Sequence, residues 1–137
     1  MNKTVLLNNR ELSEVEVQSA REAIVAMGKE LIERKLVAGS WGNVSVKIAD
    51  GVYAVTPSGR GYANQEPKDI VIIDNACSTL DGELTPSSES KLHTAIYKAC
   101  PAHDLIVHTK LGEDHGCLIV IGVVILHFRL NGQCDEI

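Results

Sequence analysis

The sequence has no cluster of positive charge. It carries 13 Lys and Arg against 18 Asp and Glu, which gives a formal net charge of −5. A nucleic-acid surface needs grouped Lys and Arg side chains that neutralise phosphates. We therefore expect no nucleic-acid partner.

Cysteine motifs and a targeting segment are also missing. The four cysteines, Cys77, Cys100, Cys117 and Cys134, form no CxxC pair, so the sequence contains neither a zinc ribbon nor a redox motif. We expect free thiols, most of them buried. The first nine residues hold an apolar run of only three. This run is shorter than the core of a signal peptide and predicts a cytoplasmic protein.

The longest apolar run is too short to cross a membrane. It covers residues 117–128, CLIVIGVVILHF, whereas a spanning helix needs roughly 20 apolar residues. Its β-branched residues and Gly122 predict one bent strand or two short ones, buried in the protein. The sequence also contains no repeat and no linker. We expect residues 1–137 to form a single globular domain. We expect no interaction with a membrane.

Apolar periodicity predicts an α/β fold. Steps of three and four residues predict a long helix over 14–35, and Ser13 and Glu16 have the spacing of a capping box. Gly39 favours a left-handed turn after this helix. Residues 41–48, Asp50-Gly51 and 52–55 predict a hairpin whose first strand has one buried face. The other expected elements are a helical turn at 66–69, a strand at 70–74 covered on both faces, a polar loop at 75–83 and a strand at 105–108.

Residues 85–93 join a proline-marked loop to the start of a second helix. Ser87, Ser88 and Glu89 fall where we expect its first turn. Free N–H groups and the helix dipole favour an anion there, and two hydroxyls suit a phosphate. Glu89 is then a candidate base for a proton on a neighbouring carbon. The alternative is an ordinary N-cap formed by Ser87 or Ser88. The helix is expected to end near residue 100 and to bury Leu92, Ala95, Ile96 and Ala99.

The loop at 56–61 has similar small donors. It contains Ser58 and Gly59 after Pro57, and a glycine lets a ligand approach the backbone. Taken alone, this loop is also consistent with an ordinary turn.

Six short segments, in this order, resemble the class II aldolase/adducin family. They are residues 42–45, 56–59, 70–74, 86–89, 95–98 and 106–109. The resemblance to the family is strongest over residues 13–109. The resemblance implies an α/β/α sandwich around a central, mostly antiparallel sheet, incomplete at its C-terminal part. It also implies a homo-oligomer, commonly a tetramer, that acts on a phosphorylated sugar.

The resemblance implies a role for each matched polar residue. Those that would hold the substrate phosphate are Asn43, Ser58, Gly59, Ser87 and Ser88. Glu89 would be the catalytic acid/base residue while the carbon–carbon bond next to the carbonyl breaks or forms. In the family, zinc held by three histidines would polarise that carbonyl and stabilise the enediolate.

The metal ligands depart from the family pattern. Where the family has His-x-His, this chain has His108-Thr109-Lys110, and a lysine repels a metal ion. His115 lies in 114–120, which resembles a later family segment, yet it follows His108 by only seven residues. This spacing fits a member that lacks the intervening stretch, or a tail from another reading frame. We expect His108 and His115 as the remaining Zn²⁺ ligands, with weak binding at most; alternatively they are a strand-end and a loop histidine.

Two classes of function are consistent with these residues. The first is a class II sugar-phosphate aldolase that reversibly cleaves a ketose phosphate to dihydroxyacetone phosphate and an aldehyde. A ribulose-phosphate epimerase and a methylthioribulose-phosphate dehydratase are related alternatives. The second class is a non-catalytic or inactive adducin-like module that binds phosphate without turnover. The set of Asn43, two serines and Glu89 favours the enzyme, and the loss of His-x-His favours the module.

Overall fold

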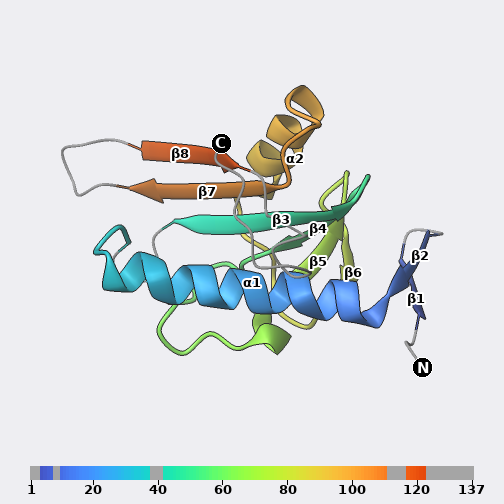
Figure 1. Cartoon of the computed structure of the whole chain (residues 1–137), viewed down its shortest axis with the longest axis horizontal. Coiled ribbons are helices and arrows are strands. Elements are labelled where there is room, and N and C mark those ends of the chain that lie inside the picture. The colour runs from blue at the N-terminus through green and yellow to red at the C-terminus, as the bar shows by residue number, and fades with distance from the viewer. Residues whose placement is uncertain (1–3, 8–9, 38–41, 111–116, 123–137) are drawn as a thin grey trace, which may run out of the picture.

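The structure, a computed structural model, describes residues 4–7, 10–37, 42–110 and 117–122, with side chains described for 6–7, 11–37 and 42–109. Pairs of consecutive strands are separated by helices or a helical turn along this length (Figure 1). The elements are β1 (Thr4–Leu7), β2 (Arg10–Ser13), α1 (Glu14–Glu33), β3 (Asn43–Ala49), β4 (Val52–Val55), the 3₁₀ turn η1 (Pro67–Asp69), β5 (Val71–Asp74), β6 (Thr79–Asp81), α2 (Ser90–Ala99), β7 (Leu105–Lys110) and β8 (Cys117–Gly122).

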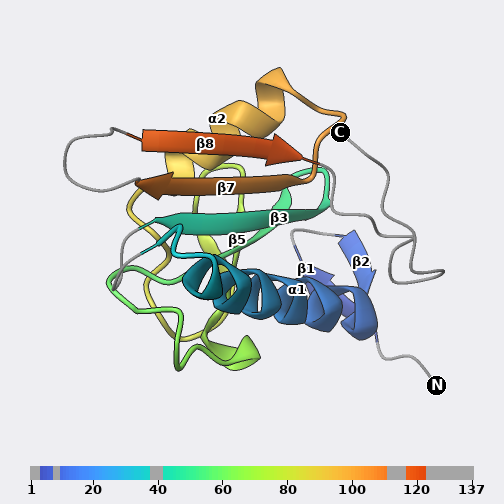
Figure 2. The same ribbon diagram turned by 60° about the vertical axis from the view of Figure 1, so that its left-hand side comes forward.

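An antiparallel sheet lies at the centre of the molecule. Six of the described strands form it, in the order β6-β5-β4-β3-β7-β8, and every neighbouring pair is antiparallel. α1 lies along one face of the sheet and α2 along the other (Figures 1 and 2). The expected α/β/α arrangement around a mostly antiparallel sheet is therefore confirmed.

Alternate residues of the central strands supply two apolar cores. On β3, Val44 and Val46 join the core on the α1 side, which includes Ile24 of the helix. On the α2 side, Tyr53 and Tyr97 belong to a smaller core, and their rings stack with centroids 4.9 Å apart. Since successive side chains of a strand point to opposite faces, Asn43 and Ser45 of β3 face α2.

The hairpin is confirmed at Asp50-Gly51. β3 ends at Ala49 and β4 begins at Val52, and Gly51 has a φ of 80°, a left-handed conformation that glycine adopts in a turn without steric cost. The expectation of a single buried face is wrong for β3, because α2 covers the other face. Ser45 on that face is only 1% exposed.

α1 begins where the capping box predicts. Ser13 Oγ accepts a hydrogen bond from Glu16 N at 3.2 Å, and Glu16 Oε2 accepts one from Ser13 N at 3.3 Å. The helix ends at Glu33, two residues before the expected end. Lys35, with a φ of 58°, takes the left-handed conformation after the helix. Gly39, which we expected in that role, lies outside the described residues.

α2 differs from the prediction in both its start and its buried face. It begins at Ser90, and Glu89 is its N-cap, so Ser87 and Ser88 precede the first turn. Leu92 is 39% exposed, and Ala95 and Ala99 are exposed as well. The side chains that the helix buries are instead Ser90, His93, Thr94 and Tyr97. The apolar pattern was misleading because the sheet surface beneath the helix is itself partly polar.

The edges of the fold contain further differences. β6 pairs with β5 inside the stretch that we expected to be a loop, and the β1–β2 hairpin was not predicted at all. β8 matches the first half of the strand expected at 117–128, and residues 123–128 lie outside the described residues. Cys77 and Cys100 are free, as expected, but half-buried. No helix in the described part of the chain is long and apolar enough to cross a membrane.

Candidate functional site

Six polar side chains meet where β3 and β7 lie against α2. Asn43, the first residue of β3, is directly opposite His108 of β7 in the strand register, so their side chains share one face of the sheet. On α2, Glu89, His93 and Tyr97 follow one another at intervals of one turn, which aligns them on one side of the helix.

Hydrogen bonds join the helix to β3 at two levels. Ser45 Oγ lies 2.8 Å from the Tyr97 hydroxyl and 2.6 Å from His93 Nδ1. The other ring nitrogen, His93 Nε2, is hydrogen-bonded to Asn43 Oδ1. All four residues are buried, with His93 and Ser45 each only 1% exposed. We call Tyr97, Ser45, His93 and Asn43 the buried polar chain.

The buried polar chain ends at the Glu89 carboxylate. Asn43 Nδ2 donates to Glu89 Oε2 at 2.5 Å. His108 Nδ1 also lies 2.5 Å from that oxygen, which is ion-pair distance, although the contact lacks hydrogen-bond geometry. The Glu89 side chain is 43% exposed. One carboxylate oxygen is thus fixed while the group as a whole still reaches solvent.

The protonation of the site follows from these contacts. Burial by itself raises the pKa of Glu89, but the hydrogen bond from Asn43 and the proximity of His108 outweigh it, and the pKa is lowered. Burial, followed by the proximity of His108, lowers the pKa of His93 to about 4 against the opposing effect of Glu89. At neutral pH, Glu89 is therefore a carboxylate and His93 a neutral imidazole.

The two serine loops lie side by side next to Asn43. Ser58 N donates to Thr85 O at 2.8 Å, and Ser87 N donates to Thr56 O at 3.0 Å. Thr56 in turn anchors the pair to β3, because its N–H donates to Val44 O at 3.0 Å and its Oγ1 accepts from Val44 N at 3.2 Å. These bonds bring together three segments that are far apart in the sequence.

The predicted phosphate-binding residues differ in exposure. Ser58, Gly59 and Ser88 are exposed, and Gly59 is in a turn with a φ of 69°. Ser87 is 9% exposed, and its Oγ accepts a hydrogen bond from Glu89 N at 3.2 Å. Neither serine is the N-cap of α2, so the ordinary N-cap interpretation is wrong. Phosphate binding by these residues stays a prediction.

The described residues do not fit a zinc ion. A zinc site needs at least three protein ligands, and no group of three or more His, Cys, Asp or Glu side chains in the described ranges could hold a metal ion. His108 directs Nδ1 at Glu89, and two residues later the sequence has Lys110 instead of the second histidine of His-x-His. His115 lies outside the described residues, so its role as a ligand stays a prediction.

Sequence reasoning missed the residues that hold Glu89. We assigned no function to His93. Ser45, Thr56 and Tyr97 lie in the segments that resemble the family, but we gave none of them a role. The signal was present in the spacing, since Glu89, His93 and Tyr97 are four residues apart and Asn43 and Ser45 are two apart. Polar residues along one side of a helix, together with polar residues along one face of a strand, are the pattern expected when the two surfaces pack against each other.

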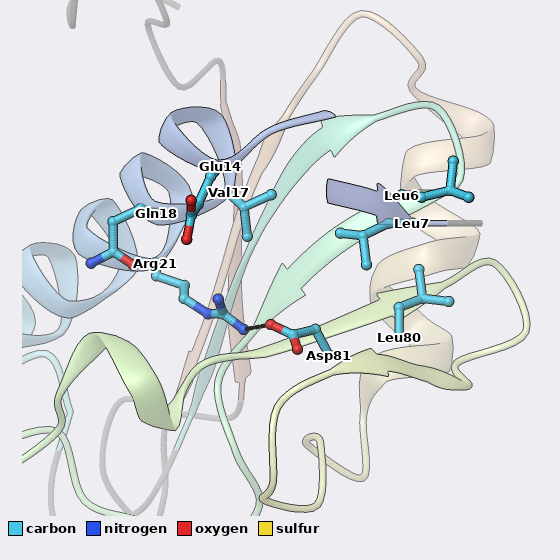
Figure 3. Close-up of a pocket in the computed structure, with 8 residues that line it drawn as sticks. All are labelled: Leu6, Leu7, Glu14, Val17, Gln18, Arg21, Leu80 and Asp81. Carbon is cyan, nitrogen blue, oxygen red and sulfur yellow. Dashed lines mark hydrogen bonds and ion pairs between the residues drawn. The ribbon is translucent and has the colours of Figure 1, made fainter. Parts of the chain in front are cut away.

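A cavity of about 390 Å³ lies elsewhere, on the α1 side of the sheet. It is lined by β1, the first turns of α1, and β6 (Figure 3). Arg21 crosses it, with Nη2 2.6 Å from Asp81 Oδ2 and Nε 3.1 Å from Ile70 O. Because this arginine is already paired and the lining includes no residue of the buried polar chain, the cavity is not the candidate site.

Two known proteins are similar to the chain over about two thirds of its length. It is 37% identical over 94 residues to 5-deoxy-D-ribulose 1-phosphate aldolase of Bacillus thuringiensis, covering 68% of this chain and 44% of the relative. It is 33% identical over 97 residues to methylthioribulose-1-phosphate dehydratase of Methylococcus capsulatus, covering 71% and 47% respectively. The chain thus spans less than half the length of these relatives.

Solved structures and a family pattern agree with these similarities. An L-fuculose 1-phosphate aldolase structure superposes with a TM-score of 0.62 at 33% identity, over 66% of this chain and 43% of the other. The sequence pattern of the family described as Class II Aldolase and Adducin N-terminal domain matches residues 22–112. Since this match covers more than half of the chain and includes β3, α2 and β7, the chain belongs to the class II aldolase and adducin family.

Proposed function

We propose that this chain binds a ketose phosphate and that Glu89 moves a proton on the carbon next to the substrate carbonyl. The observation that carries the proposal is the Glu89 carboxylate, held through Oε2 by Asn43 and His108 beside the paired serine loops. The reaction would be the reversible cleavage of a ketose phosphate to dihydroxyacetone phosphate and an aldehyde.

The state of Glu89 suits a general base. Its pKa is lowered, so the group is ionised at neutral pH, which is the protonation state a base needs, while the lower pKa makes it a weaker base. Both contacts use Oε2, and no described residue makes a hydrogen bond to Oε1. Oε1 is therefore the oxygen that would take the proton, while Asn43 limits the rotation of the carboxylate.

The anion would bind at the neighbouring loops. The hydroxyls of Ser58 and Ser88 are exposed and have no hydrogen-bond partner among the described residues, so both are available as donors. Asn43 Nδ2 has two hydrogens and uses one for Glu89, which leaves the second for the anion. Gly59 has open space around its Cα, so a phosphate could approach the backbone there.

The relatives support a five-carbon ketose 1-phosphate as the substrate class. The two curated relatives are named for ribulose 1-phosphate derivatives, although one is an aldolase and the other a dehydratase. Removal of a proton next to a carbonyl is a step that both reactions can use. Glu89 and the serine loops carry the proposal, because the described residues do not complete a zinc site.

A second candidate is a module that binds phosphate without turnover. Lys110 in place of the second histidine of His-x-His favours it, since a cation there opposes a metal ion. Such a module would keep the anion donors but would not need an ionised carboxylate beside them.

Titration of the full chain with dihydroxyacetone phosphate tests the binding step. We expect saturable binding by calorimetry, weakened roughly tenfold in Ser58→Ala and in Ser88→Ala because each loses one hydrogen bond to a charged group. Ser78→Ala, which removes an exposed loop serine elsewhere, is the matched control and should bind as the original chain does.

An assay with ketose 1-phosphates separates the two candidates. With zinc supplied, the enzyme proposal predicts release of dihydroxyacetone phosphate, and chelator treatment reports whether that release depends on metal. Binding without any cleavage or dehydration would favour the module. Binding unaffected by both serine variants would contradict the proposed anion site.

A further inference from the structure

The contacts of the buried polar chain favour one direction of hydrogen bonding. The Glu89 carboxylate only accepts hydrogen bonds, so the NH₂ group of Asn43 faces it and the Asn43 oxygen faces His93. His93 Nε2 must then carry the proton and donate. Its other nitrogen accepts from Ser45 O–H, and Ser45 Oγ in turn accepts from Tyr97 O–H.

The opposite direction is strongly disfavoured. It would put the Asn43 oxygen against Glu89 Oε2 at 2.5 Å, so that two acceptors would face each other without a proton between them. Water has little access to the Asn43 side of this contact, because Asn43 is only 5% exposed. Buried donors and acceptors without partners are costly.

We infer that His93 is a positioning residue: as the Nε2–H tautomer, with Nδ1 accepting from Ser45, it donates to Asn43 and so keeps the Asn43 amide and the Glu89 carboxylate in this orientation. This role for the α2 face was not part of the sequence prediction. The inference rests on the proposed function only for its kinetic consequences.

The orientation of Asn43 links proton transfer to anion binding. With the NH₂ group turned toward Glu89, the same nitrogen offers its second hydrogen to the anion side of the site. If the amide rotated, its oxygen would face both the carboxylate and the bound anion. His93 would therefore affect binding and turnover together although it touches neither the anion nor the reacting carbon.

The tautomer can be measured in the ligand-free protein. We expect ¹H–¹⁵N spectra of the full chain at neutral pH to show one proton on His93 Nε2, exchanging slowly with solvent, and none on Nδ1. A proton on Nδ1, or a rapidly exchanging mixture of tautomers, would overturn the inference. This measurement needs no substrate, so it is independent of the proposed function.

Variants along the chain should give graded losses. We expect kcat to fall on the order of 10²-fold in His93→Phe, which keeps the ring volume but removes the donor to Asn43. Tyr97→Phe removes only the most distant donor and should lower kcat by no more than about tenfold. Tyr53→Phe is the matched control: it removes a half-buried hydroxyl beside Tyr97 that bonds Asn75 and should leave kcat unchanged.

A conservative variant separates positioning from simple loss of structure. The amide of His93→Gln can still donate to Asn43, so this variant should recover at least tenfold in kcat over His93→Phe at similar stability. Equal kcat in the two variants, with both folded, would overturn the positioning role. If the original chain turns over no sugar phosphate, the proposed function fails. Two spectroscopic observations then still decide this inference: the His93 Nε2–H signal of the original chain, and a change in the Asn43 side-chain amide shift when His93 is replaced in His93→Phe.

Discussion

Glu89 is both accessible to solvent and held in place by its neighbours. It is 43% exposed and yet has one oxygen within 2.5 Å of both Asn43 and His108. The sequence motif indicated this residue, and the resemblance indicated Asn43. The motif could not indicate His93 or Ser45, because a histidine and a serine fit equally well on a solvent-facing surface until the opposing element is known.

Replacing Glu89 removes the proposed base. In Glu89→Gln the side chain keeps its shape and can still accept from Asn43, but it cannot take a proton. We expect turnover of a ketose 1-phosphate to fall by about 10²–10⁴-fold, with a smaller change in KM. Glu83→Gln, at an exposed position near the same helix, is the control. Unchanged turnover in Glu89→Gln would remove Glu89 from the chemistry.

The lowered pKa of His93 predicts a pH-dependent stability. The imidazole titrates at 6.5 when unfolded and at about 4 in the fold, so between these values the unfolded chain binds more protons. Stability is then complete above pH 6.5 and falls as the pH drops toward 4. Linkage gives a loss of about 2 kcal/mol between about pH 7.5 and about pH 5.

Urea unfolding at the two pH values measures this loss. In His93→Phe the contribution of this group disappears, so the difference between the two pH values should shrink by about the same 2 kcal/mol. An equal pH difference in both proteins would mean that folding does not lower the pKa of His93.

At the scale of elements, the start of β3 is held close to β7. Gly42 has a φ of 83°, and an added Cβ would lie 2.6 Å from His108 O. Neighbouring Asn43 and His108 form the candidate site, so this contact brings the two strands together where the site needs them.

Gly42→Ala should therefore be strongly destabilising. It combines a left-handed backbone, costing about 1–2 kcal/mol, with a clash against backbone that cannot move cheaply, and we expect a total above about 3 kcal/mol in urea unfolding. Gly59→Ala shares the positive φ but has nothing within 4 Å of its added Cβ. Gly59→Ala should therefore lower the free energy of unfolding only by the cost of the left-handed backbone, about 1–2 kcal/mol. Equal costs for the two variants would contradict the close contact.

Elements with clear periodicity were predictable and those with short or mixed patterns were not. The capping box and the Asp50-Gly51 turn fixed the start of α1 and the hairpin. β6 has only three residues, too few for alternation to be recognised. The buried face of α2 was missed because its partner surface contains Asn43 and Ser45, so polar helix residues pack inward while Leu92 remains exposed.

At the scale of the whole molecule, one sheet separates the main core from the site. α1 and its core lie on one face, and the buried polar chain with the smaller core lies on the other. The family pattern covers this arrangement over residues 22–112. The sheet thus provides the rigid support on which α2 positions Glu89.

Stability should depend mainly on the α1 side. Ile24 is fully buried in the core there, and Ile24→Ala should cost about 2–5 kcal/mol in urea unfolding. Val15→Ala on the same helix, at a position 54% exposed, should cost less than about 0.5 kcal/mol. Similar losses for both variants would mean that α1 does not pack on the sheet as described.

The central claim is that Glu89, held by Asn43 beside the serine loops, exchanges a proton with a carbon of a bound sugar phosphate. The most direct measurement follows deuterium from D₂O into the hydroxymethyl carbon of dihydroxyacetone phosphate by ¹H NMR, a partial reaction that needs no aldehyde. We predict incorporation with the full chain and its loss in Glu89→Gln but not in Glu83→Gln. Incorporation at the same rate with Glu89→Gln, or none with the original chain while dihydroxyacetone phosphate is bound, would contradict the account.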